Sequence, residues 1–130
     1  MSYGAKQYRR SEGGALSPRE TEAAAFEFVN RMLAHDGDSS MRMKALAKNQ
    51  QLWSMLLKDL GNTVNLLPDR LKNDLATVGF WAVRTSIAAM GDDRPVQALV
   101  QINEDMIAGL RADQAGPGSA PWVAGLALAG

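Results

Sequence analysis

Apolar residues at helical spacing dominate the middle of this 130-residue chain. Residues 49–60 carry Trp53 within a dense apolar block, and residues 67–83 carry Trp81 within a second one. A short turn at residues 61–63 separates them, and almost nothing ionisable lies on the faces that would pack. Because apolar residues that recur every three or four positions mark the packed face of a helix, the two segments predict consecutive helices that build a core or a docking surface.

Start and stop signals divide the chain into four helices. Pro18 follows a serine and precedes a glutamate at a spacing typical of a first helical turn, and residues 36–38 supply the turn that ends this helix. Pro68 opens the third helix, and residues 92–95 end it. We therefore predict an all-α domain over residues 17–112, a small bundle of about four antiparallel helices. The predicted helices lie near residues 17–35, 39–60, 67–90 and 94–111. A three-helix core that exchanges its fourth helix with a second subunit fits the same pattern.

The two ends of the chain differ from this helical part. Residues 1–16 contain three glycines and little periodicity, with Tyr3 and Tyr8 as aromatic anchors, and predict a flexible arm. Residues 113–130 are rich in Gly, Ala, Pro and Ser and predict a disordered tail. The Pro121-Trp122-Val123 sequence in this tail is able to dock on a partner.

The balance of charge argues against nucleic acid and an acidic membrane as direct partners. The chain has 14 basic and 14 acidic residues, so it lacks the long-range attraction that a polyanion exerts on a basic protein. The basic residues of the second and third predicted helices alternate with acidic ones. This alternation indicates an ordinary solvated surface, and a weak RNA-contacting strip is the alternative. These basic residues are Arg42, Lys44, Lys48, Lys58, Arg70, Lys72 and Arg84.

The chain lacks the residue combinations that catalysis or metal binding requires. His35 is its only histidine, and it contains no cysteine. His35 stands at a predicted helix end, where a capping role is favoured, and the Asp36-Gly37-Asp38 turn lacks the later ligands of a calcium loop. Asp59, Asp69 and Asp74 have no nucleophile or phosphate-binding loop beside them, so they indicate capping and solvation. We predict no enzyme activity, no cofactor and no bound metal.

The absence of cysteine fits a reducing cytoplasm. The sequence also has no apolar run long enough to cross a membrane and no signal peptide at its start. We therefore expect a soluble cytoplasmic protein.

Trp53 and Trp81 are the strongest candidates for contact with a partner. Core packing is the alternative for both, because an aromatic side chain at helical spacing usually fills a core. We expect an apolar groove formed mainly by the second and third helices, with Trp53, Met55, Leu57 and Trp81 as anchors. Methionines in the helical region add adaptable surface of the kind such grooves use. A homodimer interface is the leading alternative for this surface.

These segments resemble the flagellar biosynthesis regulator family FlaF of alphaproteobacteria. The resemblance spans roughly residues 1–112, and the tail after Asp113 is longer than the family pattern. The matching elements, in chain order, are the tyrosine-containing arm before Ser17-Pro18-Arg19-Glu20, the Asn49 to Leu60 block with Leu52-Trp53 and Asp59-Leu60, the Leu67-Pro68-x-x-Leu71 turn, and Gly79-x-Trp81.

The resemblance implies a non-enzymatic cytoplasmic protein that binds flagellin and supports its synthesis and export, together with a second regulator, FlbT. This is physically coherent, since the ends of flagellin are amphipathic segments that are disordered in the monomer and need their apolar faces covered. Direct contact with flagellin messenger RNA or with FlbT, and a structural homodimer, are the alternatives.

Overall fold

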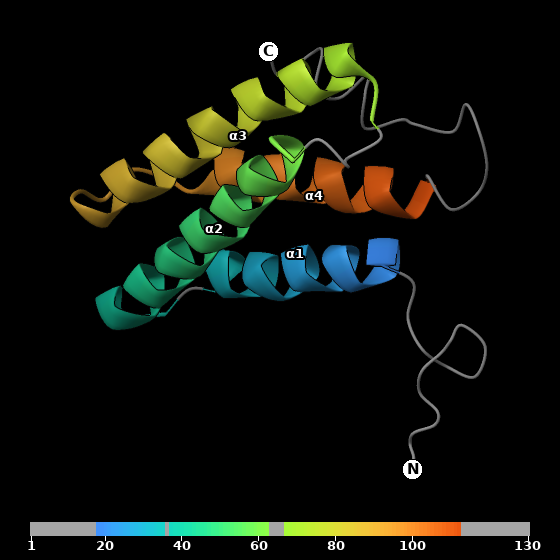
Figure 1. The fold of residues 1–130 in the computed structure, drawn as a ribbon. Coiled ribbons are helices and arrows are strands. Elements are labelled where there is room, and N and C mark those ends of the chain that lie inside the picture. Colours follow the sequence, from blue (N-terminus) through green and yellow to red (C-terminus); the bar gives the residue numbers. More distant parts are fainter. Residues whose placement is uncertain (1–17, 36, 63–66, 113–130) are drawn as a thin grey trace.

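The computed structural model describes residues 18–35, 37–62 and 67–112 of the chain (Figure 1). The helices are α1 (Pro18–Ala34), α2 (Ser39–Leu60), α3 (Asp69–Met90) and α4 (Gln97–Ala112). The described residues contain no strand, and the all-α prediction with four helices is confirmed. The predicted bounds differ most at α4, which begins at Gln97 rather than at residue 94. The arm predicted for residues 1–16 and the tail predicted for residues 113–130 lie outside the described residues.

The helices form two antiparallel pairs (Figure 1). In the first pair α2 packs along α3, and Asn49 of α2 donates a hydrogen bond to Ser86 of α3 at 2.9 Å. In the second pair α1 packs along α4, and Arg111 near the end of α4 binds Glu20 in the first turn of α1 at 2.8 Å. α1 and α2 diverge from the turn that joins them, whereas α3 and α4 contact each other only slightly. Pockets lie along both of these seams.

The core lies between the two pairs and draws on all four helices. Gly79 allows α2 and α3 to approach closely, because a Cβ atom at this position would lie 2.8 Å from Cδ2 of Leu57. A side chain larger than hydrogen would therefore push the two helices apart or displace Leu57. The largest fully buried apolar side chains are Trp53, Leu46, Leu75 and Leu99.

Side chains at the helix ends fix the short connections. Asp38 caps α2, because its Oδ1 atom accepts a hydrogen bond from the backbone N–H of Met41 at 2.9 Å. Pro68 occupies the N-cap position of α3, and its side chain makes no capping hydrogen bond there.

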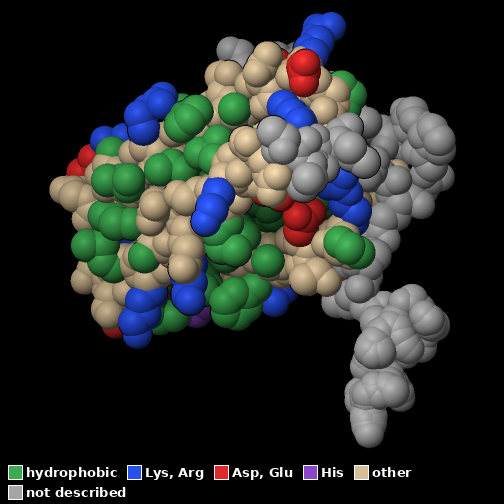
Figure 2. All heavy atoms as spheres, viewed as in Figure 1, with side chains coloured by type: hydrophobic (Ala, Val, Ile, Leu, Met, Phe, Trp, Pro, Cys, Tyr) green, Lys and Arg blue, Asp and Glu red, His purple; other side chains and the backbone are tan. Residues whose placement is uncertain are grey.

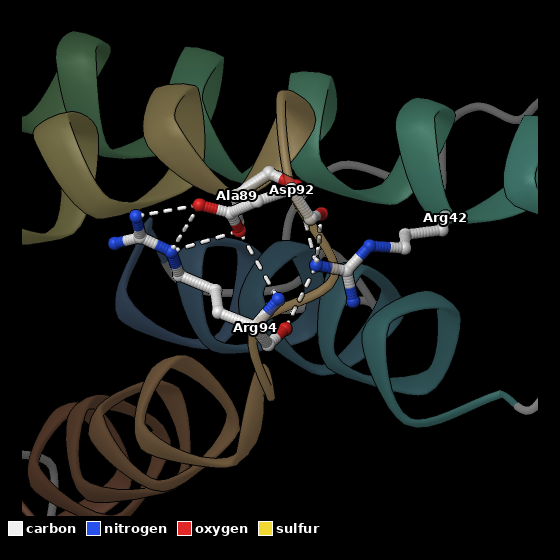
Figure 3. Close-up of polar contacts among 4 residues, drawn as sticks. All are labelled: Arg42, Ala89, Asp92 and Arg94. Carbon is white, nitrogen blue, oxygen red and sulfur yellow. Dashed lines mark hydrogen bonds and ion pairs between the residues drawn. The ribbon is translucent and has the colours of Figure 1, made fainter.

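Arg42 of α2 closes the turn between α3 and α4 (Figure 3). Its Nη2 atom donates hydrogen bonds to the backbone carbonyl oxygens of Ala89 at 3.2 Å, Asp92 at 3.2 Å and Arg94 at 2.8 Å. The last carbonyls of a helix have no partner within the helix and form the negative end of its dipole, so a guanidinium group is favoured there. Arg42 thus has a structural role, although the sequence grouped it with residues of an RNA-contacting strip.

Asp92 and Arg94 stabilise the same turn from within. The Oδ2 atom of Asp92 lies 2.7 Å from Nη2 of Arg94, and Oδ1 accepts a hydrogen bond from the Arg94 backbone N–H at 3.0 Å. The side-chain and backbone hydrogen bonds from Arg94 lower the pKa of Asp92 to about 2.

Candidate partner-binding surfaces

Trp53 belongs to the core. Its exposed fraction is 0%, and its ring meets that of Phe26 edge to face, with the ring centroids 5.3 Å apart. The indole N–H donates a hydrogen bond to Oδ1 of Asn103 at 2.8 Å. An indole that is enclosed and has its polar atom satisfied cannot touch a partner in this conformation. The structure therefore places Trp53 in the core-packing role that the sequence left open, and we remove it from the candidate surface.

A network of buried amides holds Trp53 in place. The amide nitrogen of Asn103 donates to Oδ1 of Asn49 at 2.7 Å and to Oδ1 of Asn30 at 3.2 Å. Asn49 in turn donates to Ser86 at 2.9 Å, and the four polar residues are all buried. One polar residue comes from each helix, so the network connects the whole bundle. The sequence signal for it is an asparagine that falls on an apolar stripe, as both Asn49 and Asn103 do.

The other three predicted anchors lie on three different surfaces. Met55 is 62% exposed and lies beside a groove between α1 and α2. Leu57 is half-buried and packs against Gly79 on the side of α3. Trp81 is half-buried and lines a cavity of about 490 Å³ between α3 and α4, next to Arg84. Because successive helical residues rotate by about 100°, Met55 and Leu57 cannot share a face. The structure thus does not bring the four predicted residues together.

We name the first of these surfaces the α1–α2 groove. It has a volume of about 600 Å³. Its floor is apolar and includes buried side chains from α1, α3 and α4 together with two half-buried leucines of α2. On the side of the molecule that Figure 2 shows, hydrophobic side chains lie between charged ones. The main floor residues are Phe26, Leu52, Leu56, Leu75, Met106 and Leu110.

Charged residues of both signs form the rim of the α1–α2 groove. α1 contributes Arg19 and Glu22, and α2 contributes Lys58 and Asp59. Burial raises the pKa of Glu22; the Arg19 guanidinium, 3.7 Å from this carboxylate, opposes the shift, and the negative charge of Asp59 adds to it. Two carboxylates from opposite sides of the groove therefore repel each other, and the Arg19 guanidinium on the same rim offsets this repulsion.

A second apolar surface covers the outside of the α2–α3 pair, and we name it the outer face. Phe80 is 55% exposed, Ile87 is 53% exposed and Met43 is 47% exposed. Phe80 and Ile87 are absent from the four anchors predicted from the sequence. Their signal in the sequence is a second apolar stripe on α3, because one stripe is enough for a helix to join the core. This stripe consists of Ala76, Phe80, Val83, Ile87 and Met90. The half-buried members of the outer face are Leu57, Ala76, Val83 and Met90.

A metal site has no support in the part of the chain that the structure describes. No group of three His, Cys, Asp or Glu side chains lies close enough there to hold a metal ion. His35 is exposed at the end of α1. The predictions of no metal and no cofactor stay predictions. None of the described helices combines the length and the apolar character that a membrane span requires.

Comparison with known proteins places the chain in one family. A family model described as flagellar protein FlaF matches residues 4–110. A search of curated proteins and a search of solved structures each gave no match. The match agrees with the resemblance found in the sequence, and FlaF is a family of flagellar regulatory proteins rather than a known enzyme family. Because the match covers well over half of the chain and reaches all four helices, this chain belongs to the FlaF family, whose role lies in the biosynthesis of the flagellum.

Proposed function

We propose that this protein binds the flagellin subunit and covers an amphipathic helix of it in the α1–α2 groove, in support of flagellin synthesis and export. The observation that carries the proposal is a groove with an apolar floor and a charged rim on the surface of a small helical bundle. This site differs from the groove expected from the sequence, because it lies between α1 and α2 rather than between α2 and α3.

The shape and chemistry of the groove suit a helix. An amphipathic helix binds by laying its apolar face into a hydrophobic groove, while its polar flanks meet the rim. Leu52 and Leu56 are spaced by one helical turn along one wall, so they match the i, i+4 spacing of apolar residues on a bound helix. The outer face offers apolar area as well, but the pocket that Leu57 and Phe80 line there is smaller, about 410 Å³ against about 600 Å³ for the groove.

Of the anchors predicted from the sequence, we keep Met55 for this groove. It is the most exposed of the large apolar side chains in the described part of the chain, and it lies at the edge of the α1–α2 groove. A flexible thioether adapts to the irregular apolar surface of a helix.

The test is a calorimetric titration of flagellin into the parent protein and into two methionine variants. Met55→Asp places a charge at the edge of the groove, and we expect the dissociation constant for flagellin to rise at least tenfold. Met43→Asp is the matched control, because Met43 is a similarly exposed methionine of the same helix on the outer face. This control should bind flagellin as the parent does.

Three other results would contradict the proposal. Equal affinity in the parent and Met55→Asp would mean that flagellin does not use the groove. A loss of affinity in Met43→Asp alone would move the site to the outer face. A stable two-subunit species in sedimentation that ignores added flagellin would favour the structural homodimer, whose apolar contact the outer face would supply.

A further inference from the structure

The α1–α2 groove lies close to the point where the C-terminal segment leaves the bundle. Met106 and Leu110 of α4 both contribute to the groove, and α4 ends at Ala112. Residues 113–130 follow directly. The match to the FlaF family ends at residue 110, so the family assignment carries no information on this segment.

The chemistry of the C-terminal segment matches the floor of the groove. After Asp113 the segment contains no ionisable side chain. Its large apolar residues are Trp122, Val123, Leu126 and Leu128. An uncharged apolar peptide gains free energy when it leaves water for an apolar floor, and a tryptophan gains the most because of its size. The exposed thioether of Met55 is a suitable neighbour for an indole ring.

The segment is also long enough to reach. Trp122 stands ten residues beyond Ala112, so an extended chain covers up to about 33 Å between them. The wall of the groove from Leu52 to Leu60 measures only about 12 Å along α2. A tethered segment of this length has an effective concentration on the order of millimolar at a site within its reach, so weak contacts suffice to hold it.

We propose that the Trp122-containing segment of this chain docks in its own α1–α2 groove and competes there with a helical partner. Docking of the segment does not depend on whether this protein binds flagellin. The competition rests on the proposed function, because flagellin must then displace the segment. The segment would thus weaken flagellin binding, and flagellin would displace it only at a high flagellin concentration.

The absence of cysteine allows a direct test in the full chain. The double variant Met55→Cys with Val123→Cys is oxidised with glutathione disulfide at low protein concentration, and the rate of the intrachain disulfide is followed by mass spectrometry. The control is Ala108→Cys with Val123→Cys. Ala108 is exposed on α4 and lies nearer to the segment along the chain, so a segment without a docking site would link to it at least as fast.

We expect the Met55 pair to form the disulfide at least ten times faster than the Ala108 pair. Adding Leu126→Asp to the Met55 pair should abolish this advantage. Equal rates, or a faster Ala108 pair, would overturn the docking. Disulfides between two molecules in place of intrachain ones would also overturn it and would indicate a second copy as the occupant.

A separate measurement tests the competition. Full-length Trp122→Ala should bind flagellin at least threefold more tightly than the parent, because the competing anchor is gone. An unchanged dissociation constant would overturn the competition even if the disulfide forms. If flagellin binds neither protein while the Met55 pair still links preferentially, the proposed function fails and the docking stands.

Discussion

At the scale of single residues, buried amide groups determine how the core is ordered. Asn103 accepts a hydrogen bond from the Trp53 indole and donates to Asn49 and Asn30. A buried polar atom without a partner costs more free energy than a satisfied one returns, so the members of such a network depend on each other. The network joins one polar residue of each helix, so it favours this packing over other alignments of the apolar stripes.

Replacing Asn103 should disrupt this order. Asn103→Leu has a similar volume but leaves the Trp53 N–H and the Asn49 carbonyl oxygen without partners. We expect the free energy of unfolding to fall by more than about 2 kcal/mol, measured by urea denaturation. Glu104→Gln, an exposed neighbour on α4, is the control and should stay within about 0.5 kcal/mol of the parent. A loss no larger than that of the control would show that the network adds nothing to stability.

The Asp92–Arg94 pair should make stability depend on pH in acid. The pKa of Asp92 is lowered to about 2 in the folded protein, from an ordinary value of 3.8. A carboxyl group with a lowered folded pKa stabilises the fold above its unfolded pKa, and this contribution is lost as the pH falls from about 4 to about 2. Asp92→Asn should therefore lose less stability than the parent over that range. Arg94→Gln removes the side-chain hydrogen bonds but keeps the backbone one, so its loss should lie between those of the other two proteins. Identical profiles for all three proteins would refute the effect.

At the scale of helices, α2 is the element on which the others depend. Its first turns hold the end of α3 through Arg42, its middle contributes Trp53 to the core, and its last turns form a wall of the α1–α2 groove. Its apolar residues accordingly lie on more than one side, with Trp53 toward the core, Met55 at the groove and Leu57 against α3, because α2 touches several neighbours.

Arg42 offers a test of this dependence. Arg42→Met keeps much of the apolar stem but removes the donor to the carbonyl group of Ala89 at the end of α3 and to two carbonyl groups in the turn that follows. We expect a loss of about 1–3 kcal/mol and faster amide exchange in the last turn of α3. Lys44→Met, on an exposed neighbour in the same helix, should change neither quantity appreciably. Equal effects of the two substitutions would show that the contacts of Arg42 are not important for the turn.

The same contacts affect how RNA binding should be examined. Charge reversal at Arg42 would damage the turn between α3 and α4, so any loss of binding would be ambiguous. Lys44 and Lys48 are exposed on α2 and are the suitable positions for that experiment.

At the scale of the whole molecule, the pairing of helices creates the candidate sites. α1 with α4 and α2 with α3 form the large contacts, and the remaining seams stay partly open. Apolar area consequently remains in the α1–α2 groove and on the outer face, beyond what the core uses. Contiguous apolar surface of this kind marks interaction sites in proteins.

Much of this fold follows from the sequence itself. The 3.6-residue period of apolar side chains predicts four helices, and the turn and capping residues predict their ends, because both signals are local and depend on backbone geometry. Pro18 and Asp38 illustrate this, since both stand where the local pattern predicts. The ordered set of motifs from Ser17 to Trp81 also supplied the family.

The position of the candidate site required the tertiary structure. Trp53 and Trp81 have the same residue type and similar helical surroundings, yet Trp53 is enclosed by four helices and Trp81 lies beside an open seam. A periodic pattern states which face of a helix packs, but it does not state which helix covers that face or how closely. Only the assembled pairs decide this, because burial depends on residues as far apart in the chain as Asn30 and Asn103, whose contact no local pattern encodes.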